Sequence, residues 1–181
     1  MNGCSIAKYR RSCLVNKGLE STLLILQHRL KARPDHPGIH LMRDYGQLPA
    51  VECYHSQLNQ VFMNLLANAI DALEERDRLR HFEEVHSHSS TITIRTQILS
   101  NQTITISIID NGSGIEASLC DKLFEPFFST KAIGKGTGLG LSISYQIITE
   151  KHGGKIYCHS TLGKGSEFII EIPIKQATMP T

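Results

Sequence analysis

Residues 56–75 read SQLNQVFMNLLANAIDALEE and carry the most regular helical pattern in the sequence. Apolar side chains recur there every three or four positions, while nearly all the other side chains are polar. This spacing predicts an amphipathic helix whose apolar stripe is buried against a second layer of structure. The apolar positions are Leu58, Val61, Phe62, Leu65, Leu66, Ala69, Ile70 and Leu73.

Farther along the chain the apolar pattern changes to a period of two, which predicts strands. Residues 91–98 and 103–109 alternate β-branched apolar with polar side chains around a turn at 100–102. They predict an antiparallel hairpin with one buried face. Residues 155–160 and 167–174 predict two further strands on either side of a Gly-Lys-Gly turn.

Weaker patterns complete the predicted fold. Residues 18–32 and 141–151 have helical spacing, and short runs at 39–45 and 50–54 are interpreted as a strand pair. The charged segment 76–90 has no period and is interpreted as a solvated loop. Together these elements predict an α+β protein, a two-layer α/β sandwich whose mixed, mostly antiparallel sheet has helices packed on one face.

The length of 181 residues and the 40% share of apolar residues suit one globular domain with a single core. We expect this domain to span residues 18–175. A flexible N-terminal extension over 1–17 would precede it, and a disordered tail over 176–181 would follow.

Charge and cysteine content exclude several classes of protein. The formal net charge of +2 provides no strongly basic surface, so we expect no nucleic-acid partner. The five cysteines include no Cys-x-x-Cys pair, which argues against a disulfide framework or a zinc finger and favours the reducing cytoplasm. We expect no membrane segment, because the sequence has no apolar run long enough to cross a bilayer.

The first candidate site lies on the long predicted helix. Asn64, Asn68 and Asp71 are spaced i, i+4 and i+7, so they share a face that borders the apolar stripe. Polar side chains in this place suit a site between the helix and another element. The alternative interpretation is that they are solvated surface groups.

The second candidate site follows the predicted strand 103–109, where residues 110–114 read Asp-Asn-Gly-Ser-Gly. A carboxylate at a strand end can accept a hydrogen bond from an exocyclic amine, and Gly112 and Gly114 allow the backbone to approach a flat ring. The same residue types are also common in hairpin turns, which is the alternative interpretation.

The third candidate site is the glycine-rich segment 134–140, GKGTGLG, which runs into the predicted helix 141–151. Unobstructed backbone N–H groups before a helix suit the binding of phosphates, although a flexible loop has the same composition. Lys131 and Lys135 would add positive charge. The phenylalanine-rich segment 124–128 is either an anchor to the core or part of a hinged lid.

In this order, these segments resemble the ATP-binding domain of two-component sensor histidine kinases, which belongs to the superfamily of DNA gyrase, Hsp90 and MutL. The resemblance covers about residues 56–173. Its asparagine, first glycine, phenylalanine, second glycine and glycine–strand motifs fall on residues 64–72, 110–114, 124–128, 136–141 and 163–168.

The resemblance implies that Asn68 and Asn64 are the catalytic residues. Asn68 would bind Mg²⁺ through its side-chain oxygen, with Asn64 assisting at the metal or the phosphates of ATP. Asp110 would accept a hydrogen bond from the adenine amino group, with Ser166 helping through a water, and residues 115–137 would form the ATP lid. The other implied ATP contacts are Asp71, Gly112, Gly114, Ile115, Phe124, Phe128, Lys131, Lys135, Gly136, Thr137, Gly138, Leu139, Gly140 and Leu141.

The residue at position 64 bears on the type of reaction. Superfamily members that hydrolyse ATP resemble one another in having a glutamate general base there, and the amide of Asn64 cannot take up a proton. The resemblance therefore favours transfer of the γ-phosphate to a histidine, which such kinases carry on a helical dimerisation domain with a His-Glu-x-x-x-Pro type motif. This chain has no such motif, so we expect the acceptor histidine to be supplied in trans.

The phosphate would then pass to the receiver domain of a response regulator. The alternative is a kinase or nucleotide-dependent regulator of the anti-sigma-factor type, which resembles this domain but phosphorylates serine on a partner. The pair Asn64 and Asn68 and the motif Pro-Phe-Phe-Ser-Thr-Lys at 126–131 favour the histidine kinase branch.

Overall fold

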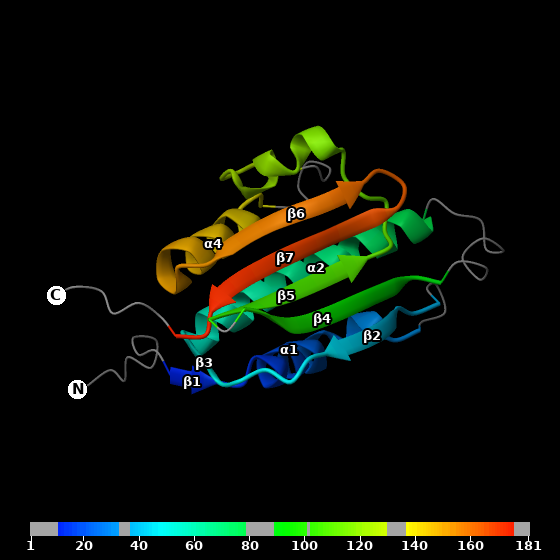
Figure 1. Ribbon diagram of the computed structural model, residues 1–181. Helices are drawn as coiled ribbons and strands as arrows, with labels where there is room; N and C mark the ends of the chain where they lie inside the picture. Colours follow the sequence, from blue (N-terminus) through cyan, green and yellow to red (C-terminus); the bar gives the residue numbers. More distant parts are fainter. Residues whose placement is uncertain (1–10, 33–36, 79–88, 101, 130–136, 176–181) are drawn as a thin grey trace, which may run out of the picture.

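The computed structural model describes residues 11–32, 37–78, 89–100, 102–129 and 137–175 (Figure 1). The strands are β1 (Arg11–Cys13), β2 (His40–Tyr45), β3 (Val51–Cys53), β4 (Thr91–Ser100), β5 (Thr103–Asp110), β6 (Lys155–Thr161) and β7 (Gly165–Pro173). The helices are α1 (Val15–Leu30), α2 (His55–Arg78) and α4 (Gly140–Gln146), with 3-10 turns at Ala117–Leu119 and Asp121–Phe124 and a π-helical turn at Ile147–Lys151.

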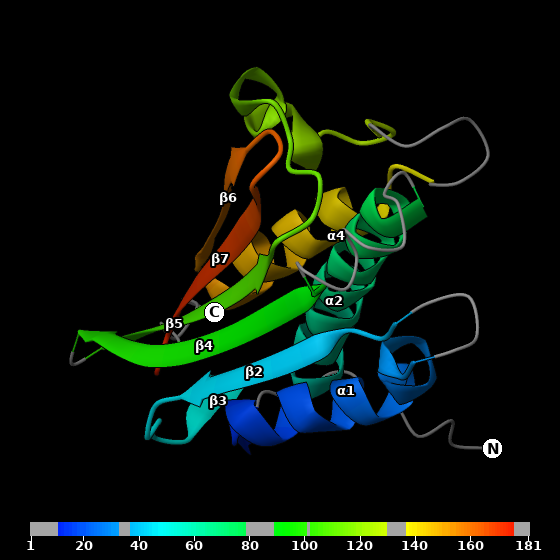
Figure 2. The ribbon, with the colours of Figure 1, turned by 90° about the vertical axis from the view of Figure 1, so that its right-hand side faces the viewer.

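Five strands form one mixed sheet in the order β2-β4-β5-β7-β6. Strand β2 runs parallel to β4, and the other neighbouring strands are antiparallel. Helices α1, α2 and α4 lie on one face of this sheet (Figure 2). The predicted α+β two-layer sandwich is therefore confirmed, as are the hairpin β4–β5 and the pair β6–β7.

The core lies between α2 and the sheet. All eight apolar positions of the predicted stripe on α2 are at most 2% exposed. They meet isoleucines of the sheet, among them Ile104, Ile106 and Ile108 on β5. A buried side chain of this size contributes roughly 1.5–3 kcal/mol, so this layer is the main source of the attraction between helix and sheet. Packing against the sheet thus sets the rotation of α2 about its axis.

The prediction that the strands at 39–45 and 50–54 pair with each other is wrong. Both strands form, but β2 pairs with β4, whereas β3 pairs with β1 in a separate two-stranded sheet. Strand β4 offers a partner along the whole of β2, from His40 opposite Thr91 to Tyr45 opposite Thr96. If β2 and β3 formed a tight hairpin instead, the backbone hydrogen bonds between β2 and β4 would be lost.

Two predicted boundaries also change. Helix α1 begins at Val15, inside the expected extension 1–17, because Val15 is buried one turn before Leu19 and continues the apolar stripe of the helix. The predicted solvated loop 76–90 is wrong at its ends, since Arg76 lies on α2 and is buried, and Ser90 is buried before β4. Residues 79–88 and the predicted tail 176–181 lie outside the described residues.

The described residues also bear on the expectations about membrane segments, disulfides and metal sites. No described helix is both long and apolar enough to cross a membrane. Within the described ranges the cysteines are free and buried, and no three His, Cys, Asp or Glu side chains gather where they could hold a metal ion.

A buried histidine joins the end of the π-helical turn to the start of α2. His152 is fully buried, and its Nε2 accepts a hydrogen bond from the backbone N–H of Tyr54 at 3.0 Å. Its Nδ1 lies 2.8 Å from the backbone oxygen of Ile147, so the ring donates there in its neutral form. His152 therefore links two segments 98 positions apart in sequence.

Replacing His152 with phenylalanine is expected to lower the free energy of unfolding by about 2 kcal/mol. The variant keeps a buried aromatic ring but loses both hydrogen bonds of the imidazole nitrogens. Urea denaturation measures this change. The matched control is His40→Phe at an exposed position on β2, which should change the free energy of unfolding by less than about 0.5 kcal/mol. Equal stability of the two variants would contradict the assigned role of the buried ring.

Candidate functional site

A cavity of about 280 Å³ lies between α2, the C-terminal end of β5, the start of β7 and the segments that follow β5 and precede α4. Its size is close to the lower limit of small-molecule sites, roughly 300 Å³. Ten of the residues predicted for a binding site line it, although they come from distant parts of the chain. They are Asn68, Asp110, Gly114, Ile115, Phe128, Thr137, Gly138, Gly140, Leu141 and Ser166.

Asp110 is the last residue of β5 and is only 4% exposed. It lies between Ile92 on β4 and Ser166 on β7, and its Oδ1 accepts a hydrogen bond from the backbone N–H of Gly112 at 2.8 Å. Burial raises the pKa of Asp110 to about 6, against the opposing effects of the N–H groups of Gly112 and Ser166 and the charge of Arg76. At neutral pH the cavity therefore contains a buried, mostly ionised carboxylate.

Two positions in the lining require glycine. Gly114 has a φ of +68°, and a Cβ there would lie 2.1 Å from the backbone oxygen of Thr161. Gly138 has a φ of +65°, and a Cβ there would lie 2.5 Å from the backbone carbon of Phe127. The N–H of Phe127 donates to the oxygen of Gly138 at 3.0 Å, so the backbone joins the phenylalanine-rich and glycine-rich segments beside the cavity.

The two asparagines of α2 have different surroundings. Asn68 is half-buried at the edge of the apolar stripe and lines the cavity. Asn64 is one turn earlier, and its Nδ2 donates to the backbone oxygen of Gly140 at 2.9 Å and to Oγ of Ser144 at 3.1 Å. The amide nitrogen of Asn64 therefore holds the first turn of α4 against α2, next to the cavity.

The lining combines a polar floor with apolar walls. Asp110 and Ser166 provide acceptors and a hydroxyl at the strand ends, and Asn68 and Glu75 face the cavity from α2. This arrangement suits a flat heterocycle with an amine donor that is attached to a polar group. The apolar walls are Ile115, Leu123, Phe128, Leu141 and Phe168.

Residues 54–176 match the family model described as histidine kinase-, DNA gyrase B- and HSP90-like ATPase. The chain belongs to this family. The match begins just before α2 and runs past β7, so it includes every segment that lines the cavity.

Curated relatives of this ATPase domain are sensor kinases. Sensor kinase CckA of Brucella abortus is 37% identical over 171 residues, which are 93% of this chain and 18% of that protein. Signal transduction histidine-protein kinase AtoS of Escherichia coli is 36% identical over 161 residues, which are 88% of this chain and 23% of that protein. The chain thus spans about a fifth of the length of these relatives.

Solved structures give the same family. The catalytic domain of histidine kinase ThkA, in a nucleotide-free form, is 28% identical with a TM-score of 0.73, covering 92% of this chain and 98% of that one. ThkA in complex with the response regulator TrrA is 25% identical with a TM-score of 0.69, covering 91% of this chain and 42% of that one. The ATPase domain described here therefore has the fold of a histidine kinase catalytic domain.

Some residues predicted for the site lie elsewhere in this ATPase domain. The Oδ1 of Asp71 is 2.7 Å from Nη2 of Arg29 on α1, in an ion pair outside the cavity lining. Phe124 packs against the ring of Tyr145, with centroids 5.7 Å apart. Gly112 and Leu139 are also outside the lining, and Lys131, Lys135 and Gly136 lie outside the described residues. Of the expected lid, residues 115–129 and 137 are described.

Six residues of the cavity lining are absent from the predicted site. On α2, Ala72 and Glu75 follow Asn68 at i+4 and i+7, so the helical period would have found them. Phe168 follows Ser166 by two positions on β7 and faces the same side, as the period of a strand predicts. The other three, Ser113, Leu123 and Ser129, lie within the candidate segment 110–114 and the expected lid 115–137, but they were not among the predicted contacts.

Proposed function

We propose that this chain is the ATP- and Mg²⁺-binding catalytic domain of a sensor histidine kinase, which transfers the γ-phosphate of ATP to a histidine on a separate dimerisation domain. The observation that carries the proposal is the shared cavity, within a fold of the histidine kinase type. It is lined by Asp110, Asn68 and four residues of the glycine-rich segment and the start of α4, namely Thr137, Gly138, Gly140 and Leu141. The phosphate would pass from that histidine to the receiver domain of a response regulator.

Asp110 would recognise the adenine ring. Its buried carboxylate can accept a hydrogen bond from the exocyclic amine, and Ser166 lies opposite on β7 with its hydroxyl 2.9 Å from that of Ser160. The apolar walls would cover the faces of the ring. Phosphates would lie along the glycine-rich segment, where Gly138 and Gly140 carry no side chain that obstructs their approach.

The donor set suits Mg²⁺ rather than a metal held by the protein alone. No cluster of three His, Cys, Asp or Glu ligands exists among the described residues, and Mg²⁺ commonly keeps waters and substrate phosphates with one or two protein oxygens. The side-chain oxygen of Asn68 would hold the ion. When bound, Mg²⁺ would neutralise charge on the phosphates.

The reaction class follows from position 64. Asn64 donates its amide hydrogens to Gly140 and Ser144, and an amide is no general base for water. Asn64 would keep α4 and the glycine-rich segment in place for the phosphates. Transfer to a nucleophile supplied by a partner is therefore favoured over hydrolysis.

The relatives support the same class of partner. ThkA has been solved with the response regulator TrrA, and several curated relatives are named sensor histidine kinases. Free cysteines in the described ranges suit a reducing compartment, and we propose the cytoplasm.

Transfer to a partner can be tested with labelled ATP, Mg²⁺ and a helical hairpin domain that carries a phospho-accepting histidine. Acid-labile, base-stable label on the hairpin is the expected result. Acid-stable label on a serine of a partner would instead support the anti-sigma-factor type of kinase. Label on neither, together with rapid release of phosphate, would mean that the domain is a hydrolase.

The affinity for ATP should fall about ten-fold between pH 7 and pH 5, because a carboxyl with a pKa of about 6 changes there from mostly ionised to mostly protonated. Protonation removes the acceptor for the adenine amine, so binding weakens as the pH falls. Calorimetry across this range measures the effect. Asp110→Asn serves as the control, because it keeps the protonation of ATP itself but has no carboxyl to titrate at this position.

A further inference from the structure

An arginine is buried beside the loop that carries Asp110. Arg76 is in the last turn of α2 and is only 7% exposed, which is unusual for a side chain that is always charged. It is not part of the cavity lining. A buried guanidinium is tolerated only where its charge and its hydrogen-bond donors are paired, so its partners indicate what it does.

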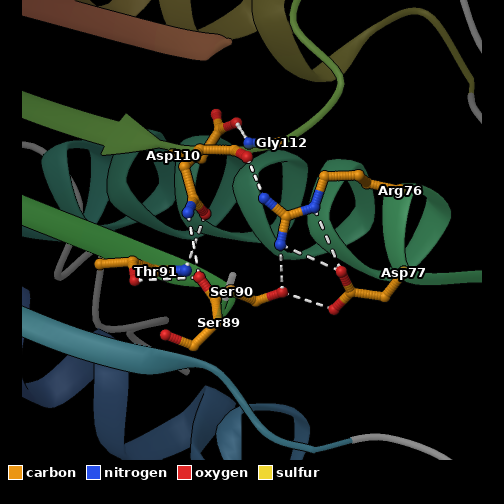
Figure 3. Close-up of polar contacts among 8 residues, drawn as sticks. Arg76, Asp77, Ser89, Ser90, Thr91, Asp110 and Gly112 are labelled. Carbon is orange, nitrogen blue, oxygen red and sulfur yellow. Dashed lines mark hydrogen bonds and ion pairs between the residues drawn. The ribbon is translucent and has the colours of Figure 1, made fainter. Parts of the chain in front are cut away.

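The guanidinium of Arg76 contacts the neighbouring residue on α2 and two other segments of the chain (Figure 3). Its Nε and Nη2 donate to Oδ1 of Asp77 at 3.1 and 3.0 Å. Nη2 also donates to Oγ of Ser90 at 2.6 Å, just before β4, and the Ser90 hydroxyl donates to Oδ2 of Asp77. Nη1 donates to the backbone oxygen of Asn111, the residue that follows Asp110.

The side chain of Asn111 is held by the first residue of β4 and by Ser89 just before that strand. Its Oδ1 accepts from the N–H of Thr91 at 2.8 Å, and its Nδ2 donates to the oxygen of Ser89 at 3.0 Å. The next residue, Gly112, donates its N–H to the carboxylate of Asp110. Arg76 and Asn111 together therefore fix the turn 110–112, and with it the direction of the carboxylate (Figure 3).

We propose that Arg76 is a positioning residue for nucleobase recognition: its hydrogen bonds hold the turn 110–112 on the side away from the cavity, and its charge acts on the Asp110 carboxylate, without touching the ligand. This inference rests on the proposed role of Asp110 in binding adenine. The two contributions are separable, because the hydrogen bonds of Arg76 fix the backbone, whereas its charge acts on the carboxylate through space.

Among the residues that the structure describes, few charged groups surround Asp110. From α2 it faces Arg76, with Asp77 paired to that arginine, and Glu75 lines the same cavity. From β6 it interacts with the thiol of Cys158, whose burial keeps it neutral, and its neighbour on β4 is the uncharged Ile92. On β7, Glu167 points to the opposite face from Ser166. Arg76 is therefore the nearby positive charge among the described residues, and it lowers the pKa of Asp110 against the larger effect of burial.

The test is the pH dependence of ATP binding, measured by calorimetry from about pH 5.5 to 8.5, where a displaced carboxyl titration becomes visible. The acidic limb is the part of the pH profile in which the affinity for ATP falls as the pH is lowered. In Arg76→Gln this limb should move up by about one pH unit, which makes binding about five-fold weaker than in wild type near pH 6. Arg76→Lys keeps the charge, so its limb should stay near that of wild type even if the affinity falls at every pH. Arg95→Gln removes a charge from an exposed ion pair with Asp44. It should change neither the position of the acidic limb nor the affinity for ATP.

A second variant covers the case in which Arg76→Gln does not fold. Asp77→Asn removes the negative charge beside Arg76, so the acidic limb should move to lower pH, in the opposite direction. Unmoved limbs in Arg76→Gln and Asp77→Asn would overturn the proposal, even if affinity fell uniformly as for a purely structural residue. Unmoved limbs in a domain that still binds ATP would overturn this inference alone. A wild-type domain that binds no ATP would overturn the proposed function as well, so the two failures can be told apart.

Discussion

Asn68→Ala should abolish Mg²⁺-dependent binding of ATP, with an expected loss of at least about 100-fold in affinity, because the variant lacks the proposed side-chain oxygen for the ion. The fold should survive, since Asn68 is at the edge of the buried stripe rather than within it. Calorimetry with ATP, in the presence and absence of Mg²⁺, measures the effect. The melting temperature of the nucleotide-free protein reports on the fold.

The chain offers a matched control on the same helix. Asn59→Ala makes the same chemical change on α2 outside the cavity lining. The Oδ1 of Asn59 is buried and has no hydrogen-bond partner in the part of the chain that the structure describes. This variant should bind ATP and Mg²⁺ like wild type. If Asn68→Ala also kept wild-type affinity in the presence of Mg²⁺, the proposed place of the metal would be wrong.

Asp110→Asn should weaken ATP binding by about 30–100-fold at pH 7, because a buried hydrogen bond to a charged group is lost or rearranged. The carboxylate accepts hydrogen bonds from the N–H of Gly112 and from Ser166 and still offers lone pairs to the adenine amine. An asparagine has one acceptor oxygen fewer, and its NH₂ group would face either the N–H of Gly112 or the adenine amine, both of which are donors. The single oxygen can then accept from the turn or from the adenine, but it serves both poorly.

Nucleotide choice gives an independent measurement of the same site. GTP has a carbonyl oxygen where ATP has its amine, so it would present an acceptor to the Asp110 carboxylate and bind more weakly than ATP. Asp44→Asn is the control, because that carboxylate is exposed on β2 and pairs with Arg95. Equal affinity of the wild-type domain for ATP and GTP would argue against adenine recognition by Asp110.

The long helix shows how far local spacing reaches. Its apolar stripe is confirmed at every predicted position because burial on an amphipathic helix follows directly from the period of 3.6. The polar face was harder to predict. Asp71 lies about 100° around the helix from Ala72, which places it toward α1 instead of the cavity. Arg29 pairs there with both Asp71 and Glu74, a contact between residues more than 40 positions apart.

The strand pairing shows a second limit. Alternation predicted the hairpin β4–β5 because its two strands are joined by a short turn. The parallel ladder between β2 and β4 has α2 between its strands in the sequence, and no local pattern records such a partner. The expected pair of β2 with β3 failed because proximity in sequence was the only guide available.

Periodicity and motif order were thus sufficient for the α+β sandwich, for the buried face of α2 and for the residues Asn68, Asp110 and Ser166 that meet in one cavity. These are properties of neighbouring residues and of the order of motifs along the chain. The burial of Arg76 beneath the turn 110–112 depended on tertiary packing. A charged residue in an aperiodic segment is normally solvated, and only the approach of Ser90 and Asn111 from other elements provides the partners that allow its burial.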